Sequence, residues 1–487
     1  MLRLREYQLR GIEQASKRLA AGVRRVCLVL PTGGGKTVVA SEIIRRAVAR
    51  GRRVLFLAHR RELLDQTLNK LHDAGVHDVG LVLAGERQRY RPHAPVQVAS
   101  VQTLVRRVMP PAELVFIDEA HHANAGSYEK ILANYPGAKV LGLTATPVRD
   151  DGRGLVEQFD EALVIATPRE LIAEGHLAKP RVFGARERVD LSGVHSRGGD
   201  YVPHELEREM MKSRLIGDIV EHWIRLAHDR TTVVFATSVA HSQKIVEAFR
   251  AQGVIAEHLD GTTPMDERRA ILARLASGAT EVVSNCAVLT EGWDLPRCKC
   301  VILARPTQSL SLYLQMAGRG LRPWEGIDPM LLDHGECVDR HGFPQDERDW
   351  PSYFAGKKRG ANDSAPVKDC PSCYAIVPAA QKVCDACGHV FVTEPRDGPV
   401  QVDDELVERT SAQERPVDER RAWYAQTLAE GARSLKKLGW CRHRFSERYG
   451  HWPAFHELER EYYPREAPPD KLQGVPSWLA DQLREVG

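Results

Sequence analysis

Short apolar runs recur through the first two thirds of the chain, with stretches of helical period between them. The first four runs cover residues 26–30, 54–58, 114–117 and 140–143. Each run is continuous rather than alternating, which is typical of strands that are buried on both faces of a parallel sheet. Residues 36–50 and 61–74, which lie between such runs, have the period of amphipathic helices. The pattern therefore predicts the strand–helix–strand units of a doubly wound α/β domain.

A second α/β domain is predicted further along the chain. Residues 166–213 are less regular and include a polar, glycine-rich stretch at 191–200, which indicates a connector. The strand pattern then returns at residues 232–236, 254–258, 281–284 and 301–303. We therefore predict a first α/β domain (1–165), a connector (166–213), a second α/β domain (214–345), a linker (346–368), a cysteine module (369–392), a polar linker (393–419) and a small helical C-terminal domain (420–487).

Composition narrows the class of protein without identifying it. Of the 487 residues, 43% are hydrophobic and 27% are charged, which is ordinary for a globular protein. No apolar run approaches the ~18–20 residues that a membrane helix needs, and the charged start lacks the apolar core of a signal peptide. We therefore expect a cytoplasmic protein with no membrane partner. Because the net charge is only +3, nucleic-acid binding would depend on local basic clusters.

A glycine-rich loop follows the first predicted strand, with the sequence Pro31-Thr32-Gly33-Gly34-Gly35-Lys36-Thr37. Backbone N–H groups of such a loop cradle phosphates, while Lys36 reaches the β- and γ-phosphate oxygens and Thr37 holds Mg²⁺. The helix that follows directs its positive dipole at the same point. Leu30 replaces the first glycine of the general motif. A turn without a ligand is the alternative, but the strand–loop–helix context predicts an ATP and Mg²⁺ site.

Two carboxylates end the third predicted strand. Asp118 and Glu119 stand at its carboxyl end, where α/β sheets bind their ligands. There Asp118 would hold Mg²⁺ through water, and Glu119 would polarise the attacking water, as phosphoryl transfer requires. Taken alone, such a pair is often only a solvated strand end. Its position after a phosphate loop favours ATP hydrolysis.

These motifs together resemble those of superfamily 2 helicases, which have two RecA-like α/β domains. Asp-Glu-Ala-His at 118–121 is similar to the second motif of that superfamily, and further motifs appear in order over residues 5–322. The resemblance implies that Arg5, Tyr7 and Gln8 read the adenine base, with the amide of Gln8 on its edge. It also implies that the motifs at 58–63 and 100–103 contact the nucleic-acid backbone. The residues concerned are His59, Arg60, Arg61, Gln102 and Thr103.

The later motifs of the resemblance describe how two domains would work together. Thr144 and Thr146 resemble the motif that links hydrolysis to domain movement, although they could equally be strand-end hydroxyls. Residues 290–294 resemble the fifth motif and 315–322 the sixth. The implied roles are nucleic-acid contact for Thr290, nucleotide contact for Gly292 and Asp294, a link across the cleft from His121 to Gln315, and arginine fingers for Arg319 and Arg322. Surface salt bridges and a surface histidine are the alternatives for these arginines and His121.

The cysteines of the predicted module form two Cys-x-x-Cys pairs ten residues apart. Cys370, Cys373, Cys384 and Cys387 have the spacing of a closed tetrahedral Zn²⁺ site. In a cytosolic chain this pattern favours structural zinc over disulfides or free thiols. A module of this size has almost no core, so we expect the metal to supply its folding energy.

The C-terminal domain carries basic and aromatic residues together. Residues 433–448 contain six Lys or Arg and one acid, with Trp440 and Phe445 among them. This composition suits phosphate contact with base stacking. An apolar core for the two aromatic residues, with solvated charges around it, is an equal alternative.

The connector and the cysteine ribbon make the chain similar to the bacterial and phage RadD-like group of DNA-repair helicases. The relevant residues are Asp200, within Arg-Gly-Gly-Asp-Tyr, and the segments 333–335 and 340–342. The resemblance implies action on single-stranded or branched DNA, a role in repair or recombination, and contact with single-strand-binding protein or a recombinase. The alternatives are an RNA helicase, a scaffold that uses ATP only as a switch, and the motor subunit of a restriction complex.

Overall fold

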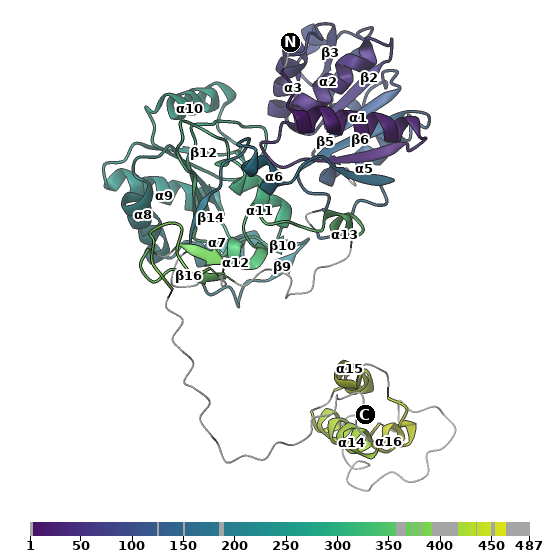
Figure 1. Cartoon of the computed structure of the whole chain (residues 1–487), viewed down its shortest axis with the longest axis vertical. Helices are drawn as coiled ribbons and strands as arrows, with labels where there is room; N and C mark the ends of the chain where they lie inside the picture. The colour runs from purple at the N-terminus through teal and green to yellow at the C-terminus, as the bar shows by residue number, and fades with distance from the viewer. Residues whose placement is uncertain are drawn as a thin grey trace. The chain divides into compact units, whose positions relative to one another are not determined.

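The computed structural model describes residues 3–123, 126–149, 151–184, 189–356, 367–373, 375–378, 381–391, 417–434, 436–449 and 453–463. The chain divides into two compact units, Met1–Val392 and Thr393–Gly487 (Figure 1). The larger unit contains two α/β lobes, each built on its own parallel sheet. The predicted linkers 346–368 and 393–419 lie partly outside the described residues.

The first lobe is a seven-stranded sheet in the order β3-β4-β2-β5-β6-β1-β7, and its strand pairs are all parallel. Four strands coincide with the continuous apolar runs of the sequence, which confirms those predictions. The strands are β1 (Arg25–Val29), β2 (Val54–Ala58), β3 (Val79–Val82), β4 (Val96–Ser100), β5 (Leu114–Asp118), β6 (Lys139–Thr144) and β7 (Glu161–Val164).

Helices cover both faces of this sheet, which explains why its strands are apolar throughout. One face packs on α1, α2 and α3 through residues such as Tyr7, Ile44 and Leu64. The other face packs on α4 and α5 through residues such as Leu104 and Ile131. The helices are α1 (Glu6–Ala20), α2 (Lys36–Val48), α3 (Arg61–Asp73), α4 (Val101–Leu104) and α5 (Gly126–Leu132), with the short 3₁₀ turns η1 (Arg87–Arg89) and η2 (Ala120–His122).

The second lobe has a six-stranded parallel sheet in the order β12-β13-β11-β14-β15-β8. Its edge strand β8 comes from the segment predicted as a connector, which also forms a small hairpin of β9 and β10. The strands are β8 (Arg181–Gly184), β9 (Ser196–Arg197), β10 (Asp200–Tyr201), β11 (Thr232–Ala236), β12 (Ala256–Leu259), β13 (Val282–Asn285), β14 (Cys300–Ala304) and β15 (Met330–Asp333). β8 and β15 were not among the predicted strands.

Helices again lie on both faces of the second sheet (Figure 1). α8 and α9 pack on one face through Trp223 and Phe249, and α10 and α11 pack on the other through Leu275 and Tyr313. The helices between the lobes and in the second lobe are α6 (Pro168–Ala173), α7 (Pro203–Met210), α8 (Ser213–Ala227), α9 (Val239–Ala251), α10 (Met265–Ser277), α11 (Leu310–Ala317) and α12 (Cys337–His341).

After the second lobe, the chain returns to the first. Helix α13 (Trp350–Phe354) buries Trp350 and Phe354 in the apolar core of the first lobe, on the α4–α5 face. The backbone N–H of Leu155 donates to the Phe354 carbonyl at 2.9 Å, which fixes this return. The start of the predicted linker is therefore a packed helix in the structure.

The cysteine module follows, with strands β16 (Val367–Asp369) and β17 (Ile376–Pro378) forming an antiparallel pair. It is packed against the second lobe rather than standing free. Cys370 and Cys384 belong to the same buried cluster as Phe183 of β8, and Arg181 donates to the Ala386 carbonyl at 3.0 Å. The module therefore shares a core with the edge of the second sheet.

The described part of the C-terminal unit contains the helices α14 (Val417–Arg433), α15 (Leu438–Tyr449) and α16 (His456–Tyr462). Its core includes Tyr424, Leu428 and Phe445, and a buried Glu459 accepts from Tyr424 and Arg442 at 2.6–2.9 Å. Phe445 is thus a core residue, as one of the two alternatives held. Within the described residues, no helix combines the length and the apolar character needed to cross a bilayer.

Candidate active site between the two lobes

The glycine-rich loop joins β1 to α2 at the carboxyl end of the first sheet. Gly33 and Gly35 have φ angles of 92° and 85°, a region that side chains other than glycine rarely adopt. A Cβ atom at Gly33 would collide with the guanidinium of Arg322, and one at Gly35 would lie 2.6 Å from the amide of Gln8. Gly33 and Gly35 are therefore needed both for the turn and for the close approach of other groups.

The residues predicted to read adenine lie behind this loop. Tyr7 Oη donates to the Gly34 carbonyl at 2.8 Å, and Gln8 Nε2 donates to the same carbonyl at 3.2 Å. Gln8 Oε1 accepts from the backbone N–H of Arg5 at 3.0 Å, while the Arg5 guanidinium donates to Tyr7 Oη at 3.2 Å. Both ends of the Gln8 amide are thus engaged within the protein, and the buried Tyr7 ring packs on His176. Contact of these residues with a base stays a prediction.

The two predicted carboxylates meet Lys36 at the end of β5. The Lys36 ammonium lies 3.5 Å from Glu119 Oε1, and the Glu119 backbone N–H donates to Asp118 Oδ1 at 3.1 Å. Burial raises the pKa of Asp118 to about 7; the neighbouring Glu119 charge adds to the rise and the Lys36 charge opposes it. Two buried carboxylates beside one ammonium leave an excess of negative charge, which a divalent cation would neutralise.

A line of polar contacts joins the two lobes next to these carboxylates. His121 Nδ1 lies 3.1 Å from Thr144 Oγ1 and 3.5 Å from Glu119 Oε2. On its other side, His121 Nε2 lies 3.2 Å from Gln315 Nε2 of α11. The link across the cleft that the resemblance implied is present in the geometry.

The threonines at the end of β6 are bridging groups rather than isolated hydroxyls. Thr146 Oγ1 donates to Ser311 Oγ of α11 at 2.9 Å, which is a second contact between the lobes. Thr144 Oγ1 donates to the Thr146 carbonyl at 2.8 Å and holds the turn between them.

The two predicted arginine fingers have different surroundings. Arg319 is buried, and its guanidinium donates to the carbonyls of Thr290 and Trp293, within the loop 290–294. Arg322 Nε pairs with Asp294 Oδ1 at 2.9 Å, and its guanidinium lies against Gly33 of the phosphate loop. Of the two, Arg322 is the one that reaches the first lobe.

The sequence prediction missed Glu291, which lies inside the fifth motif. Its carboxylate contacts His59 Nε2 at 2.9 Å, Arg60 Nε at 3.2 Å and His122 Nε2 at 3.3 Å, all from the first lobe. Gln315 Nε2 of its own lobe lies 3.3 Å away. An acid between Thr290 and Gly292 was visible in the sequence, but nothing in its spacing indicated this burial.

The remaining predicted nucleic-acid contacts spread over the two lobes. His59, Arg60 and Thr290 lie at the cleft, and Arg60 and Thr290 line a cavity of about 240 Å³ there. Arg61 pairs with Glu86 on the first lobe, Gln102 accepts from Ser100 and Thr103 accepts from the Ala84 backbone N–H. Gly292 approaches α3, where Gln66 donates to its carbonyl at 2.6 Å.

The four cysteines of the module converge on one point. Their sulfur atoms all lie within 4.8 Å of one another, with Cys370–Cys387 at 3.6 Å and Cys373–Cys384 at 3.7 Å. Sulfur atoms around a tetrahedral zinc with bonds of ~2.3 Å are separated by ~3.8 Å. These distances exclude disulfide bonds and fit a Zn²⁺ ion.

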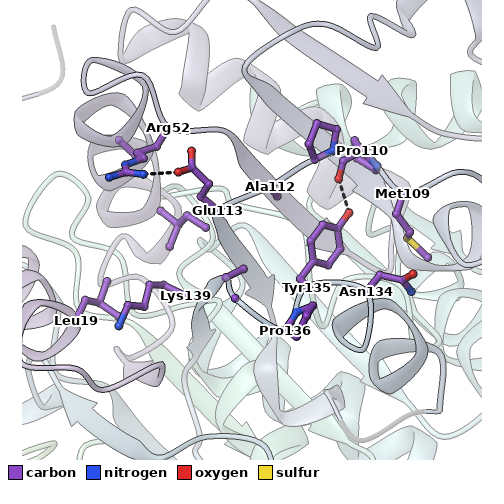
Figure 2. Close-up of a pocket in the computed structure, with 15 residues that line it drawn as sticks. Leu19, Arg52, Met109, Pro110, Ala112, Glu113, Asn134, Tyr135, Pro136 and Lys139 are labelled. Atoms are coloured by element: carbon purple, nitrogen blue, oxygen red, sulfur yellow. Dashed lines mark hydrogen bonds and ion pairs between the residues drawn. The ribbon is translucent and has the colours of Figure 1, made fainter.

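A larger hollow, of about 960 Å³, lies at the amino ends of the strands of the first sheet (Figure 2). Its wall includes Glu113 and Lys139, next to the starts of β5 and β6. Figure 2 shows Arg52 paired with Glu113, and Tyr135 donating to the Pro110 carbonyl at 2.6 Å. Ligands of open α/β sheets bind at the carboxyl ends of strands. The smaller cavity between the lobes is therefore the better site.

Two family models match the two lobes. The model "Type III restriction enzyme, res subunit" covers residues 1–149, and "Helicase conserved C-terminal domain" covers residues 212–323. A 51.5 kDa protein of Lactococcus phage (isolate 7-9) is 33% identical over 380 residues, which are 77% of this chain and 80% of that protein. The chain belongs to the superfamily 2 helicases. It is accordingly an ATP-dependent enzyme of the helicase type, as its motifs predicted.

Further members of the superfamily resemble the same part of the chain. A Saccharomyces cerevisiae protein named as a candidate ATP-dependent helicase, IRC3, is 33% identical over 343 residues, which are 66% of this chain but only 49% of IRC3. A solved fragment of an HsdR-type subunit of a type I restriction enzyme from Vibrio vulnificus has a TM-score of 0.56 at 23% identity, covering 72% of this chain and 66% of the fragment. This likeness confirms two RecA-like lobes as the fold.

Proposed function

We propose that this helicase hydrolyses ATP to move along or unwind DNA, with its active site between the two lobes. The observation that carries the proposal is the meeting of Gly33, Lys36 and Glu119 of one lobe with Arg322 of the other. Such a site is complete only when the lobes are closed. Opening and closing of the cleft would therefore accompany each hydrolytic cycle, which is what a translocating motor requires.

The proposed roles follow from position and charge. ATP with Mg²⁺ would supply the transferable phosphoryl group and neutralise its charge. The loop of Gly33–Gly35 offers backbone N–H groups to the phosphates, with Lys36 as cation and Thr37 and Asp118 as the side chains that would hold Mg²⁺. Glu119 is placed to orient the attacking water. Arg322 is placed to stabilise charge on the phosphate oxygens.

DNA is the proposed substrate. The family model over the first lobe and the solved fragment both carry the names of restriction enzymes, a DNA-acting class. The resemblance of the connector to the RadD-like group also supports DNA. Its Asp200, which accepts from Thr307 Oγ1 and the Gln308 backbone N–H at 3.0 and 2.8 Å, lines the cavity in the cleft. On this resemblance we propose a role in repair or recombination, with single-strand-binding protein or a recombinase as partner.

The proposal also covers the cysteine module. We propose that Cys370, Cys373, Cys384 and Cys387 hold Zn²⁺, because the sulfur spacing suits it. A cytoplasmic location is likewise proposed. The predicted domain limits are also proposed, except that residues 181–184 join the second sheet as β8 and residues 350–354 pack on the first lobe as α13. A motor subunit of a restriction complex is the second candidate, favoured by the same restriction-enzyme names.

Steady-state ATP hydrolysis tests the proposal, with single-stranded, duplex and forked DNA and RNA in parallel. We expect DNA to stimulate turnover, and Lys36→Ala to abolish it because the phosphate contact is lost. Lys70→Ala is the matched control, since this exposed lysine pairs with Asp73 on the outer side of α3. If RNA alone stimulates turnover, the substrate is RNA rather than DNA. Normal turnover by Lys36→Ala would overturn the assignment of the site.

A further inference from the structure

Glu291 has an unusual position for an acidic residue in a protein that binds polyanions. It lies in the loop 290–294 of the second lobe, and its side chain is only 4% exposed. Three of the four donors around its carboxylate come from the first lobe, and two of these, His59 and Arg60, are predicted nucleic-acid contacts. A buried carboxylate therefore lies where the protein would otherwise present positive charge to a backbone phosphate.

The charge of Glu291 is maintained in this place. Burial acts to raise its pKa, but hydrogen bonds from His122 and His59, together with the charges of His59 and Arg60, hold the pKa well below its usual range. The group is thus an anion whose two oxygens have nitrogen atoms of four side chains within 3.3 Å. This is the donor pattern that protein sites also offer to a phosphate.

The same carboxylate is the first member of a line of contacts that leads to the hydrolytic site. Gln315 Nε2 is shared between Glu291 Oε1 at 3.3 Å and His121 Nε2 at 3.2 Å. His121 in turn lies 3.5 Å from Glu119 Oε2. A change in the contact between Glu291 and Gln315 therefore also affects His121, which lies next to Glu119.

We propose that Glu291 is a positioning residue that substitutes for a nucleic-acid phosphate in the free protein and restrains hydrolysis until nucleic acid replaces it. A bound phosphate takes over Arg60 and His59, and its negative charge repels the Glu291 carboxylate. Glu291 then moves away from Gln315, which is left to His121 alone. The cavity of about 240 Å³ lined by Arg60, His122 and Glu291 gives room for this exchange. The inference rests on the proposed function, because it assumes that nucleic acid stimulates turnover.

Glu291→Gln tests the inference in the full-length protein, because the amide keeps the shape and removes the charge. ATP turnover is measured without nucleic acid and as a function of oligo(dT) and oligo(rU). We expect basal turnover to rise several-fold, the stimulated-to-basal ratio to fall, and the half-maximal oligonucleotide concentration to fall by about tenfold, since a competing anion is gone.

Glu257→Gln is the matched control. Glu257 of β12 is also a largely buried carboxylate paired with an arginine, Arg274 of α10, but this pair lies within the second lobe. It should leave the stimulated-to-basal ratio unchanged. If Glu291→Gln lowers basal and stimulated turnover together, or leaves the ratio at the wild-type value, the inference is wrong. If the wild-type protein itself is not stimulated by either oligonucleotide, the proposed function fails instead.

Discussion

At the scale of single residues, the two arginines of the sixth motif show how a short motif divides its work. Arg319 is fully engaged with carbonyl groups of the loop 290–294, and it therefore fixes the shape of that loop. Arg322 Nη1 is buried and has no hydrogen-bond partner among the described residues. Although Arg322 Nε pairs with Asp294, a buried Nη1 without an acceptor is costly unless a ligand supplies one. We infer that Arg322 is the arginine finger.

Replacing Arg322 should separate binding from hydrolysis. We expect Arg322→Ala to bind ATP nearly normally and to lose about 10³-fold or more in single-turnover hydrolysis, the usual magnitude for an arginine finger. Nucleotide binding is measured by fluorescence of a labelled ATP analogue, and hydrolysis by quenched flow. Arg52→Ala removes an exposed arginine that pairs with Glu113 at the amino ends of the strands. It should change neither nucleotide binding nor the rate of hydrolysis. Unchanged hydrolysis by Arg322→Ala would remove its role as a finger.

The sequence could predict those contacts whose residue types are restricted by the chemistry. Lys36, Asp118 and Gln315 were predicted because glycine loops, strand-end acids and the order of motifs leave few other interpretations. Glu291 and His122 were not predicted, because they are about 170 residues apart in the chain and meet only when the two lobes come together. Tyr7 and Gln8 were predicted to read adenine, which stays a prediction, and the structure shows them holding the phosphate loop through the Gly34 carbonyl.

At the scale of elements, β8 and the cysteine module depend on each other. The four residues of β8 form the edge of the second sheet, and the module covers that edge through Ala375, which bridges to Phe183. An exposed edge strand invites unwanted pairing, and the module blocks it. Spacing in the sequence identified the four cysteines but gave no sign of this docking, because the contact depends on a strand inside an irregular segment.

Loss of one cysteine should therefore also destabilise the second lobe, on which the module packs. We expect Cys384→Ser to lose bound zinc and to lower the melting temperature by several degrees, since Cys384 belongs to the buried cluster shared with the second lobe. Metal content is measured by inductively coupled plasma spectrometry beside thermal unfolding. Cys286→Ser, outside the cluster, should retain the metal. A zinc content equal to that of the wild-type protein would contradict the four-cysteine site.

At the scale of the whole molecule, buried histidines make stability depend on pH. Burial lowers the pKa of His334 to about 3 and that of His241 and His341 to about 4. The Thr237 hydroxyl and backbone N–H both lie within 3.3 Å of His241 Nδ1, so this nitrogen acts as an acceptor in the neutral ring. The unfolded chain takes up these protons near pH 6.5, whereas the folded chain does not. Their stabilising effect is therefore complete above pH 6.5 and declines as the pH falls below it.

The size of this effect can be isolated with one variant. At one pH unit below 6.5, each such histidine costs about 1.4 kcal/mol of folding free energy. The raised pKa of the buried Asp333, about 6, acts in the opposite direction, so the net curve alone is not decisive. We expect His334→Gln to be less destabilised than the wild-type protein between pH 7.5 and 5.5 in urea titrations. The exposed His228→Gln should keep the wild-type dependence, and an unchanged slope for His334→Gln would contradict the argument.

The return of the chain through α13 has a mechanical consequence. The polypeptide leaves the first lobe after β7 to build β8, and it comes back to bury Trp350 and Phe354 beside Leu155. Two lobes joined by a single backbone connection can rotate about it in every direction. After α13 the chain crosses back again to the cysteine module on the second lobe, so three backbone connections join the two lobes. Several separate connections restrict the relative rotation of two bodies more than a single one does. The path of the backbone therefore limits the directions in which the cleft can open, and a cut between α12 and α13 would still leave two of the connections in place.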